Sequence, residues 1–147
     1  MQVLKSLAKT IAVCALAIGL VGCEKASPEY ERIDKIPYAE WNTFARRLPL
    51  NQRLDLHIEI MERSGHNPPM TISESFSDAP QETYALIRNR IEAGAESRYY
   101  IPVLYEINRQ DNFSICDQED RKIVQDYLWR FATNAVRPEE RANFYTC

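Results

Sequence analysis

Apolar residues recur every three or four positions through most of the chain after residue 37, which is the spacing of one face of an α-helix. The 147 residues include only four glycines, and no stretch alternates β-branched and polar residues as a half-buried strand would. Pro49, Gly65 and Gly94 interrupt the helical pattern at points where a helix would end. We therefore predict an all-α fold, a small bundle of about five helices within residues 37–147.

The boundaries of the predicted helices follow from these interruptions and from capping residues. The helices are expected over residues 37–48, 51–64, 78–93 and 98–110 and from Asp117 onward, with a last short turn over 138–147. Asp78, with Gln81 three positions further on, has the spacing of a capping box. Pro102 predicts that the fourth helix either starts late, near Ile101, or bends.

Three features of the pattern predict how the helices pack. The helix over 51–64 has apolar side chains on about half of its circumference, which predicts a central helix packed on two sides. In the loop over 66–77, Ile72 and Phe76 are candidates to enter the core. The last long helix has a continuous apolar face, which consists of Val124, Tyr127, Leu128, Phe131 and Ala135.

The N-terminus has the pattern of an export signal. Lys5 and Lys9 form a positive segment, and the apolar run that follows, residues 11–22, is shorter than the roughly 20 residues that a membrane-spanning helix needs. The run ends in Leu20-Val21-Gly22-Cys23, which resembles the lipobox of bacterial lipoprotein precursors. The resemblance implies that residues 1–22 are a cleaved signal peptide, that the Cys23 thiol carries diacylglycerol and that the new amino group is acylated. The alternative is an ordinary secreted protein that is cut before Cys23.

The same resemblance sets the expected organisation and location of the mature chain. Residues 23–36 are polar and contain Pro28, and we interpret them as a lipidated tether in front of the helical domain at 37–147. The protein would therefore be anchored in the cell envelope by its lipid. Glu24 follows the cysteine, where Asp would favour retention in the inner membrane, so an outer-membrane location facing the periplasm is favoured.

The charge of the mature chain argues against two classes of partner. Removal of Lys5 and Lys9 leaves 16 basic and 21 acidic side chains. Such an acidic domain lacks the basic surface that nucleic-acid binding requires, and it lacks a polybasic patch for anionic lipid. Partners are therefore expected to be the membrane, through the lipid on Cys23, and another envelope protein.

Two cysteines remain outside the signal peptide and the lipidation site. Cys116 and Cys147 are an even pair in an oxidising compartment, and a disulfide between them would close a loop of about 32 residues. The alternatives are a metal pair and a reactive thiol, but neither cysteine belongs to a CxxC motif or adjoins a histidine. We predict that one disulfide stabilises the bundle.

The sequence contains no recognisable catalytic, metal-binding or cofactor-binding motif. His57 lies within the broad apolar arc of its predicted helix, so we expect it to be buried and hydrogen-bonded. Asp55, Glu59 and Glu62 lie on the polar side of the same helix, where a solvated acidic face is the simplest interpretation. We predict neither metal nor cofactor and no enzymatic activity, although an enzyme with a cryptic site remains an alternative.

Three aromatic residues are candidates for a binding surface. Trp129 lies off the apolar face of the last long helix, and Tyr99 and Tyr105 lie off the inward face of the helix before it. Exposed Trp, Tyr and Arg are enriched at the centres of protein interfaces. The alternative is that another helix, such as the first one or the terminal turn, covers these side chains. The leading hypothesis is that the domain binds another envelope protein. One concrete version is an immunity protein against a toxin that acts in the periplasm. The alternative is an accessory subunit of an envelope secretion or cell-wall complex.

Overall fold

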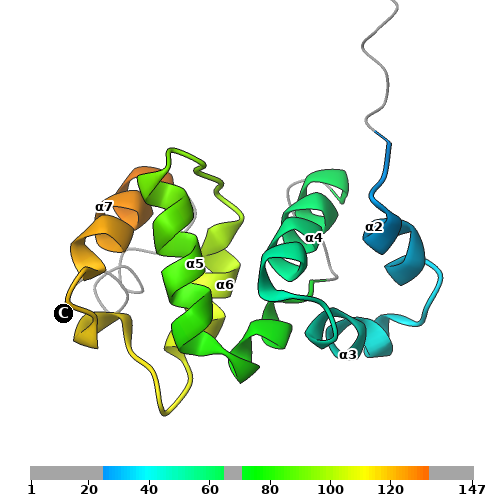
Figure 1. Ribbon diagram of the computed structural model, residues 1–147, viewed down its shortest axis with the longest axis horizontal. Coiled ribbons are helices and arrows are strands. Elements are labelled where there is room, and N and C mark those ends of the chain that lie inside the picture. Colours follow the sequence, from blue (N-terminus) through cyan, green and yellow to red (C-terminus); the bar gives the residue numbers. More distant parts are fainter. Residues whose placement is uncertain (1–24, 65–70, 133–147) are drawn as a thin grey trace, which may run out of the picture.

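The structure is a computed structural model, which describes residues 25–64 and 71–132. These two ranges contain helices and no strand, so the all-α prediction is confirmed. The described ranges contain six α-helices and three short 3-10 helices, and Figure 1 shows their arrangement. In chain order they are α2 (Pro28–Ile33), η2 (Tyr38–Glu40), α3 (Trp41–Arg46), α4 (Leu50–Arg63), η3 (Ser73–Asp78), α5 (Pro80–Glu92), α6 (Tyr100–Asn108), η4 (Ile115–Asp117) and α7 (Arg121–Ala132).

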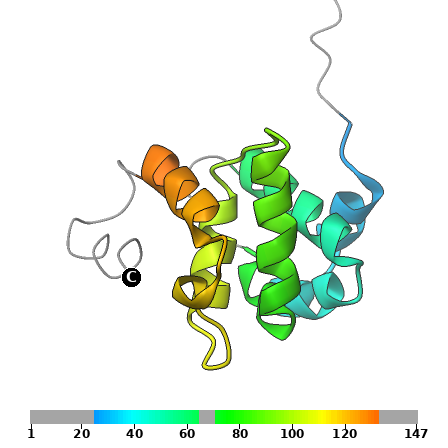
Figure 2. The same cartoon turned by 60° about the vertical axis from the view of Figure 1, so that its left-hand side comes forward.

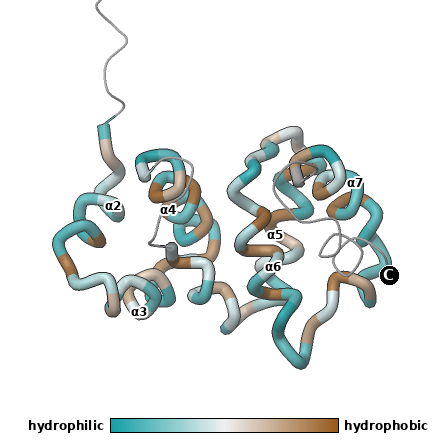
Figure 3. The backbone as a smooth tube through the Cα atoms, turned by 180° about the vertical axis from the view of Figure 1, so that it is seen from behind, coloured by the Kyte–Doolittle hydropathy of each residue, from teal (hydrophilic) through white to brown (hydrophobic). Residues whose placement is uncertain are grey.

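The helices enclose two hydrophobic cores that share α4. Leu54 belongs to the larger core, which it forms with α5, α6 and α7, whereas Leu56 and Ile60 belong to the smaller core with α2 and α3. Residues two positions apart on a helix point to nearly opposite sides, so one helix serves both cores. Figure 3 shows hydrophobic segments along α4 and where α5, α6 and α7 pack together. The prediction of a central helix packed on two sides is confirmed.

The segment before α5 runs between the two cores. Ile72 is fully buried in the smaller core and Phe76 is fully buried in the larger core, which confirms the prediction that both enter the interior. They lie four positions apart, and η3, which follows Ile72 and contains Phe76, gives the chain a compact, hydrogen-bonded path. The segment therefore joins the two halves of the domain.

A buried arginine on α4 fixes this junction. Arg53 Nη1 donates to Ser75 O and to Asp78 Oδ1, both at 2.7 Å, and Arg53 Nη2 donates to Arg46 O at 3.0 Å. Its guanidinium also lies 5.7 Å from the centre of the Phe76 ring. One side chain thus donates hydrogen bonds to backbone carbonyl oxygens at the end of α3 and in η3. Without Arg53 these oxygens would be removed from water and have no hydrogen-bond donor.

This arginine explains why the predicted capping box at α5 is wrong. The N-cap residue of α5 is Ala79, and no side chain caps the helix. Asp78 does not act as the cap because its carboxylate pairs with Arg53. Gln81 instead donates to Gln118 Oε1 at 2.8 Å. The predicted start of the last long helix also shifts, since Asp117 ends η4 and α7 begins four residues later.

The start of α6 places Pro102 in the first turn of the helix. Pro102 is the third residue of α6, and a residue in the first turn needs no intrahelical partner for its missing N–H. The late start predicted for this helix is therefore confirmed. Ala135 and the predicted turn over 138–147 lie outside the described residues.

The folded region begins earlier than the sequence suggests. Part of the segment assigned to the tether, residues 23–36, forms α2, which starts with Pro28 at N1 and is capped by the Ser27 side chain at 3.1 Å. Ile33 at its end is fully buried in the smaller core. The described part of the tether is therefore docked on α4 and is not a free spacer (Figure 1).

Candidate functional site

The candidate surface is the outer face of α7, whose inner face is anchored in the larger core. Val124, Tyr127 and Leu128 are fully buried, which fixes the rotation of the helix about its axis. The sequence prediction of an inward stripe is confirmed for these three residues. Phe131 was predicted to continue the stripe, but it is 37% exposed. It lies in the last described turn of α7 and packs on the Tyr127 ring of the same helix, with centroids 5.0 Å apart.

Polar contacts hold α7 at both of its ends. At the start, Tyr84 of α5 donates to Asp120 Oδ1 at 2.9 Å, and Arg88 forms an ion pair with Asp120 Oδ2 at 2.9 Å. Burial, and then the hydrogen bond to this carboxylate, raise the pKa of Tyr84 well above its ordinary value, so its hydroxyl remains a donor. At the end, Arg130 forms an ion pair with Glu96 in the connection between α5 and α6. The outer face is therefore presented on a fixed helix.

The outer face itself is a stripe of one aromatic and several polar side chains. Lys122, Gln125, Asp126 and Trp129 are spaced three, four and seven positions apart, so they lie on one side of α7. With Glu119 and Arg121 they line an open depression of about 360 Å³. Trp129 is 50% exposed, and Lys122 and Asp126 form an ion pair at 3.0 Å. An indole beside paired charges offers both apolar area and polar contacts to a partner.

The other two predicted binding residues do not line this depression. Tyr99 is half-buried at the start of α6, and the Arg98 guanidinium lies 5.1 Å from the centre of its ring. Tyr105 is 52% exposed on α6. The structure places Trp129 on the outer face of α7 and therefore does not gather the three aromatics into one site.

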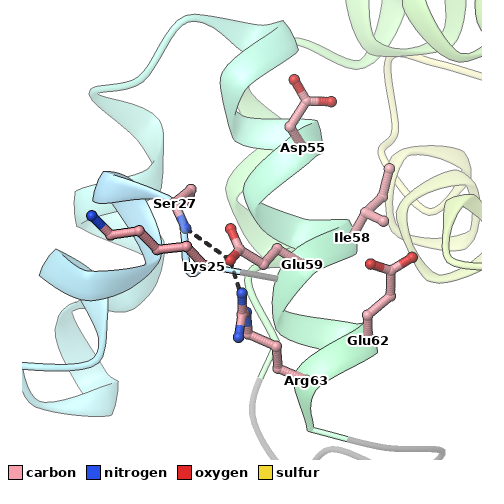
Figure 4. A pocket seen from close by; sticks show the side chains of 7 residues that line it. All are labelled: Lys25, Ser27, Asp55, Ile58, Glu59, Glu62 and Arg63. Carbon is pink, nitrogen blue, oxygen red and sulfur yellow. Dashed lines mark hydrogen bonds and ion pairs between the residues drawn. The ribbon is translucent and has the colours of Figure 1, made fainter. Parts of the chain in front are cut away.

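A second depression, of about 490 Å³, lies along α4 and beside the residues before α2. Figure 4 shows its acidic side chains along α4, with Ser27 and Arg63 both directed at Glu59. Glu59 Oε1 accepts hydrogen bonds from the Ser27 N–H at 3.0 Å and from Arg63 Nε at 2.8 Å. Burial alone would raise the pKa of Glu59, but these hydrogen bonds and the charge of Arg63 lower it.

The carboxylates of this depression do not form an acid–base pair. Asp55 forms an ion pair with Arg90 of α5 at 2.6 Å, and Glu59 is held ionised by its partners. A general acid at neutral pH would need a raised pKa, which is the opposite of the shift at Glu59. The exposed Glu62 completes the row. The acidic face predicted for this helix is present, and two of its three carboxylates are partnered by arginine.

His57 is buried and hydrogen-bonded, as the sequence predicted. It is fully buried, its Nε2 donates to the backbone oxygen of Tyr99 at 2.9 Å, and its ring packs edge-on against Phe76. Burial lowers the pKa of His57 to about 4, despite the opposing effect of the hydrogen bond. The residue therefore joins α4 to the start of α6 as a neutral side chain.

Neither a candidate metal site nor a membrane-spanning helix occurs in the part of the chain that the structure describes. No group of three or more His, Cys, Asp and Glu side chains in residues 25–64 and 71–132 is placed to hold a metal ion. In the same ranges, every helix is too short or too polar to cross a membrane. Cys23, Cys147 and the predicted signal peptide over 1–22 lie outside the described residues.

Comparisons with protein-family models, curated proteins and solved structures found no match to this chain. Sequence reasoning missed Arg53, because nothing in its spacing distinguishes a buried arginine from a solvated one. It also missed Ser27, whose side chain caps α2 and whose backbone binds Glu59.

Proposed function

We propose that this protein is a lipid-anchored envelope protein whose helical domain binds another protein. In this proposal, residues 1–22 are removed and Cys23 carries the lipid. The domain faces the periplasm, from the outer membrane in preference to the inner one. The motif Leu20-Val21-Gly22-Cys23 after a short apolar run supports the anchor. Two or more acyl chains are needed for stable attachment, and a lipoprotein carries them.

The observation that carries the binding role is the exposed Trp129 on a helix that is fixed at both ends. Its indole is half exposed beside the Lys122–Asp126 ion pair, on the side of α7 opposite the core. A rigid surface with a central aromatic loses little conformational entropy when a partner binds. The acidic charge and the small size of the domain suit an immunity protein that sequesters a periplasm-acting toxin.

A disulfide between Cys116 and Cys147 is part of the same proposal. Cys116 lies in η4, directly before α7, and its backbone N–H is bound by the Ser114 side chain at 3.1 Å. A covalent link from this turn to the C-terminus would restrain the chain that follows α7. It would thereby support the helix that carries Trp129.

The binding role can be tested by site-specific photo-crosslinking in envelope membranes. A photoreactive residue in place of Lys122, which shares the outer face of α7 with Trp129, should give a defined adduct with one envelope protein. The same residue in place of Glu40, an exposed position on η2, serves as the control. The adduct at Lys122 should disappear in a Trp129→Ala background. Adducts that are identical at the two positions, or that persist without Trp129, would contradict this surface.

A further inference from the structure

The free chain between the proposed lipid site at Cys23 and the folded domain is much shorter than the predicted tether over residues 23–36. Ser27 is fixed to α4 by the hydrogen bond from its N–H to Glu59 Oε1 at 3.0 Å. Tyr30 follows on α2, where its ring lies 5.1 Å from the Arg63 guanidinium, and Ile33 is fully buried. These contacts bind the segment from Ser27 to Ile33 to the surface of α4.

Ser27 lies four positions after Cys23, and an extended chain of four residues spans at most about 14 Å. For comparison, α4 alone has 14 residues and is about 21 Å long. Building on the lipid anchor of the proposed function, we infer that the domain lies directly on the phospholipid surface. The end that carries Ser27 faces the headgroups.

The arrangement of the helices shows what this end contains. The described chain starts at the upper edge of the view in Figure 1, and the connection between α5 and α6 lies at the same edge. The last turn of α7 also ends there, and Figure 2, turned about the vertical axis, agrees. The connection over 109–114, between α6 and η4, forms the opposite edge in both views and is largely hydrophilic in Figure 3.

This orientation also bears on the partner. Trp129 belongs to the last turn of α7 and would therefore be presented beside the bilayer. A protein that docks on the outer face of α7 must then expose its own binding segment close to the membrane surface. Lys25, exposed just before the docked segment, is placed to meet phosphate groups at this end.

The orientation can be measured on the lipidated protein in vesicles of phosphatidylethanolamine and phosphatidylglycerol that carry a headgroup quencher. A fluorophore would be attached at Glu62→Cys, beside Ser27 in the α4 depression, or at Asp111→Cys, in the connection at the opposite edge. Protein without an added cysteine gives the background labelling. We expect loss of fluorescence at Glu62→Cys and little loss at Asp111→Cys.

A matched variant tests whether the short chain is the cause. A flexible Gly/Ser insert of about twelve residues after Glu24 lengthens the free chain without touching the domain, and it should abolish the difference between the two labels. Equal quenching at the two sites without the insert would overturn the orientation while the lipid anchor stands. Mass spectrometry of the N-terminal peptide tests the anchor separately, and an unacylated Cys23 would overturn both.

Discussion

Arg53 and Asp78 form an ion pair at 2.7 Å in which the arginine side chain is 6% exposed and the aspartate side chain 40% exposed. The pair is therefore asymmetric. The arginine also serves the backbone oxygens of Arg46 and Ser75, whereas the carboxylate retains contact with water.

This asymmetry predicts unequal costs for the two substitutions. Arg53→Met should lower the free energy of unfolding by about 3–5 kcal/mol, because it leaves buried carbonyl oxygens without a donor. Asp78→Asn should cost about 1 kcal/mol or less, because the side chain is partly solvated and an amide oxygen still accepts. Denaturant unfolding of both variants measures the difference, and equal costs would contradict the assigned role of Arg53.

His57 predicts a loss of stability in mild acid. Its pKa falls from 6.5 to about 4 on folding, so the unfolded state binds the proton more readily. The stabilisation is complete above pH 6.5 and is lost progressively as the pH falls towards 4, a change of about 3 kcal/mol. Unfolding free energies of wild type and His57→Gln across this range test it. The slope should flatten in the variant, and parallel curves would refute the assignment. The lowered pKa of Glu59 adds stability that is lost as the pH falls below about its ordinary value of 4.5, so it overlaps only the acidic end of this window.

Substitution of the two tryptophans by alanine should have opposite effects on folding stability and partner binding. Trp41 is 5% exposed and its Nε1 donates to Ile36 O at 3.2 Å, so Trp41→Ala should cost about 3–5 kcal/mol of folding stability. Trp129→Ala should leave stability nearly unchanged and weaken partner binding by about 2 kcal/mol or more. Thermal melts and quantitative pull-downs separate the two effects. A Trp129→Ala protein that melts early would make Trp129 a structural residue.

The proposed disulfide predicts a linked peptide pair. Mass spectrometry of protein isolated under non-reducing conditions should find Cys116 joined to Cys147. Cys147→Ser should lower stability by about 3–4 kcal/mol, according to the chain-entropy estimate for a loop of this length. Quantitative alkylation of both thiols in protein from the periplasmic side would exclude the link.

The lipid anchor predicts that Cys23→Ser abolishes lipid labelling and processing at that site. The hydroxyl cannot form the thioether that precedes cleavage in lipoprotein precursors. Fractionation of envelope membranes and metabolic labelling with a fatty acid are the measurements. Unchanged processing and membrane attachment would refute the anchor.

Much of the fold could be predicted because it depends on periodicity. In each of the five helices from α3 to α7, apolar residues recur every three or four positions and form one face. The wide apolar arc of α4, which packs on two sides, is also visible in the sequence. The burial of His57 and the position of Trp129 off the apolar stripe follow from the same wheel geometry. The wheel does not show whether another helix covers the indole, which the structure finds 50% exposed.

What the sequence did not reveal depends on contacts between distant residues. α2 has six residues and buries Ile33 alone, which is too little to establish a period. Asp78 has the spacing of a helix cap, but Arg53 lies 25 positions away in sequence and takes its carboxylate. The free chain after Cys23 is short because a hydrogen bond joins Ser27 to Glu59, which lies 32 positions away in the sequence.

The sharing of α4 between the two cores has a consequence for how the domain opens. Leu54 closes the larger core and Leu56 the smaller one, so neither half keeps a complete interior if α4 leaves it. A nick between the halves would therefore yield fragments that fail to fold separately. The amide hydrogens of α4 should be the slowest to exchange with solvent, since their exposure requires both halves to come apart in the same event.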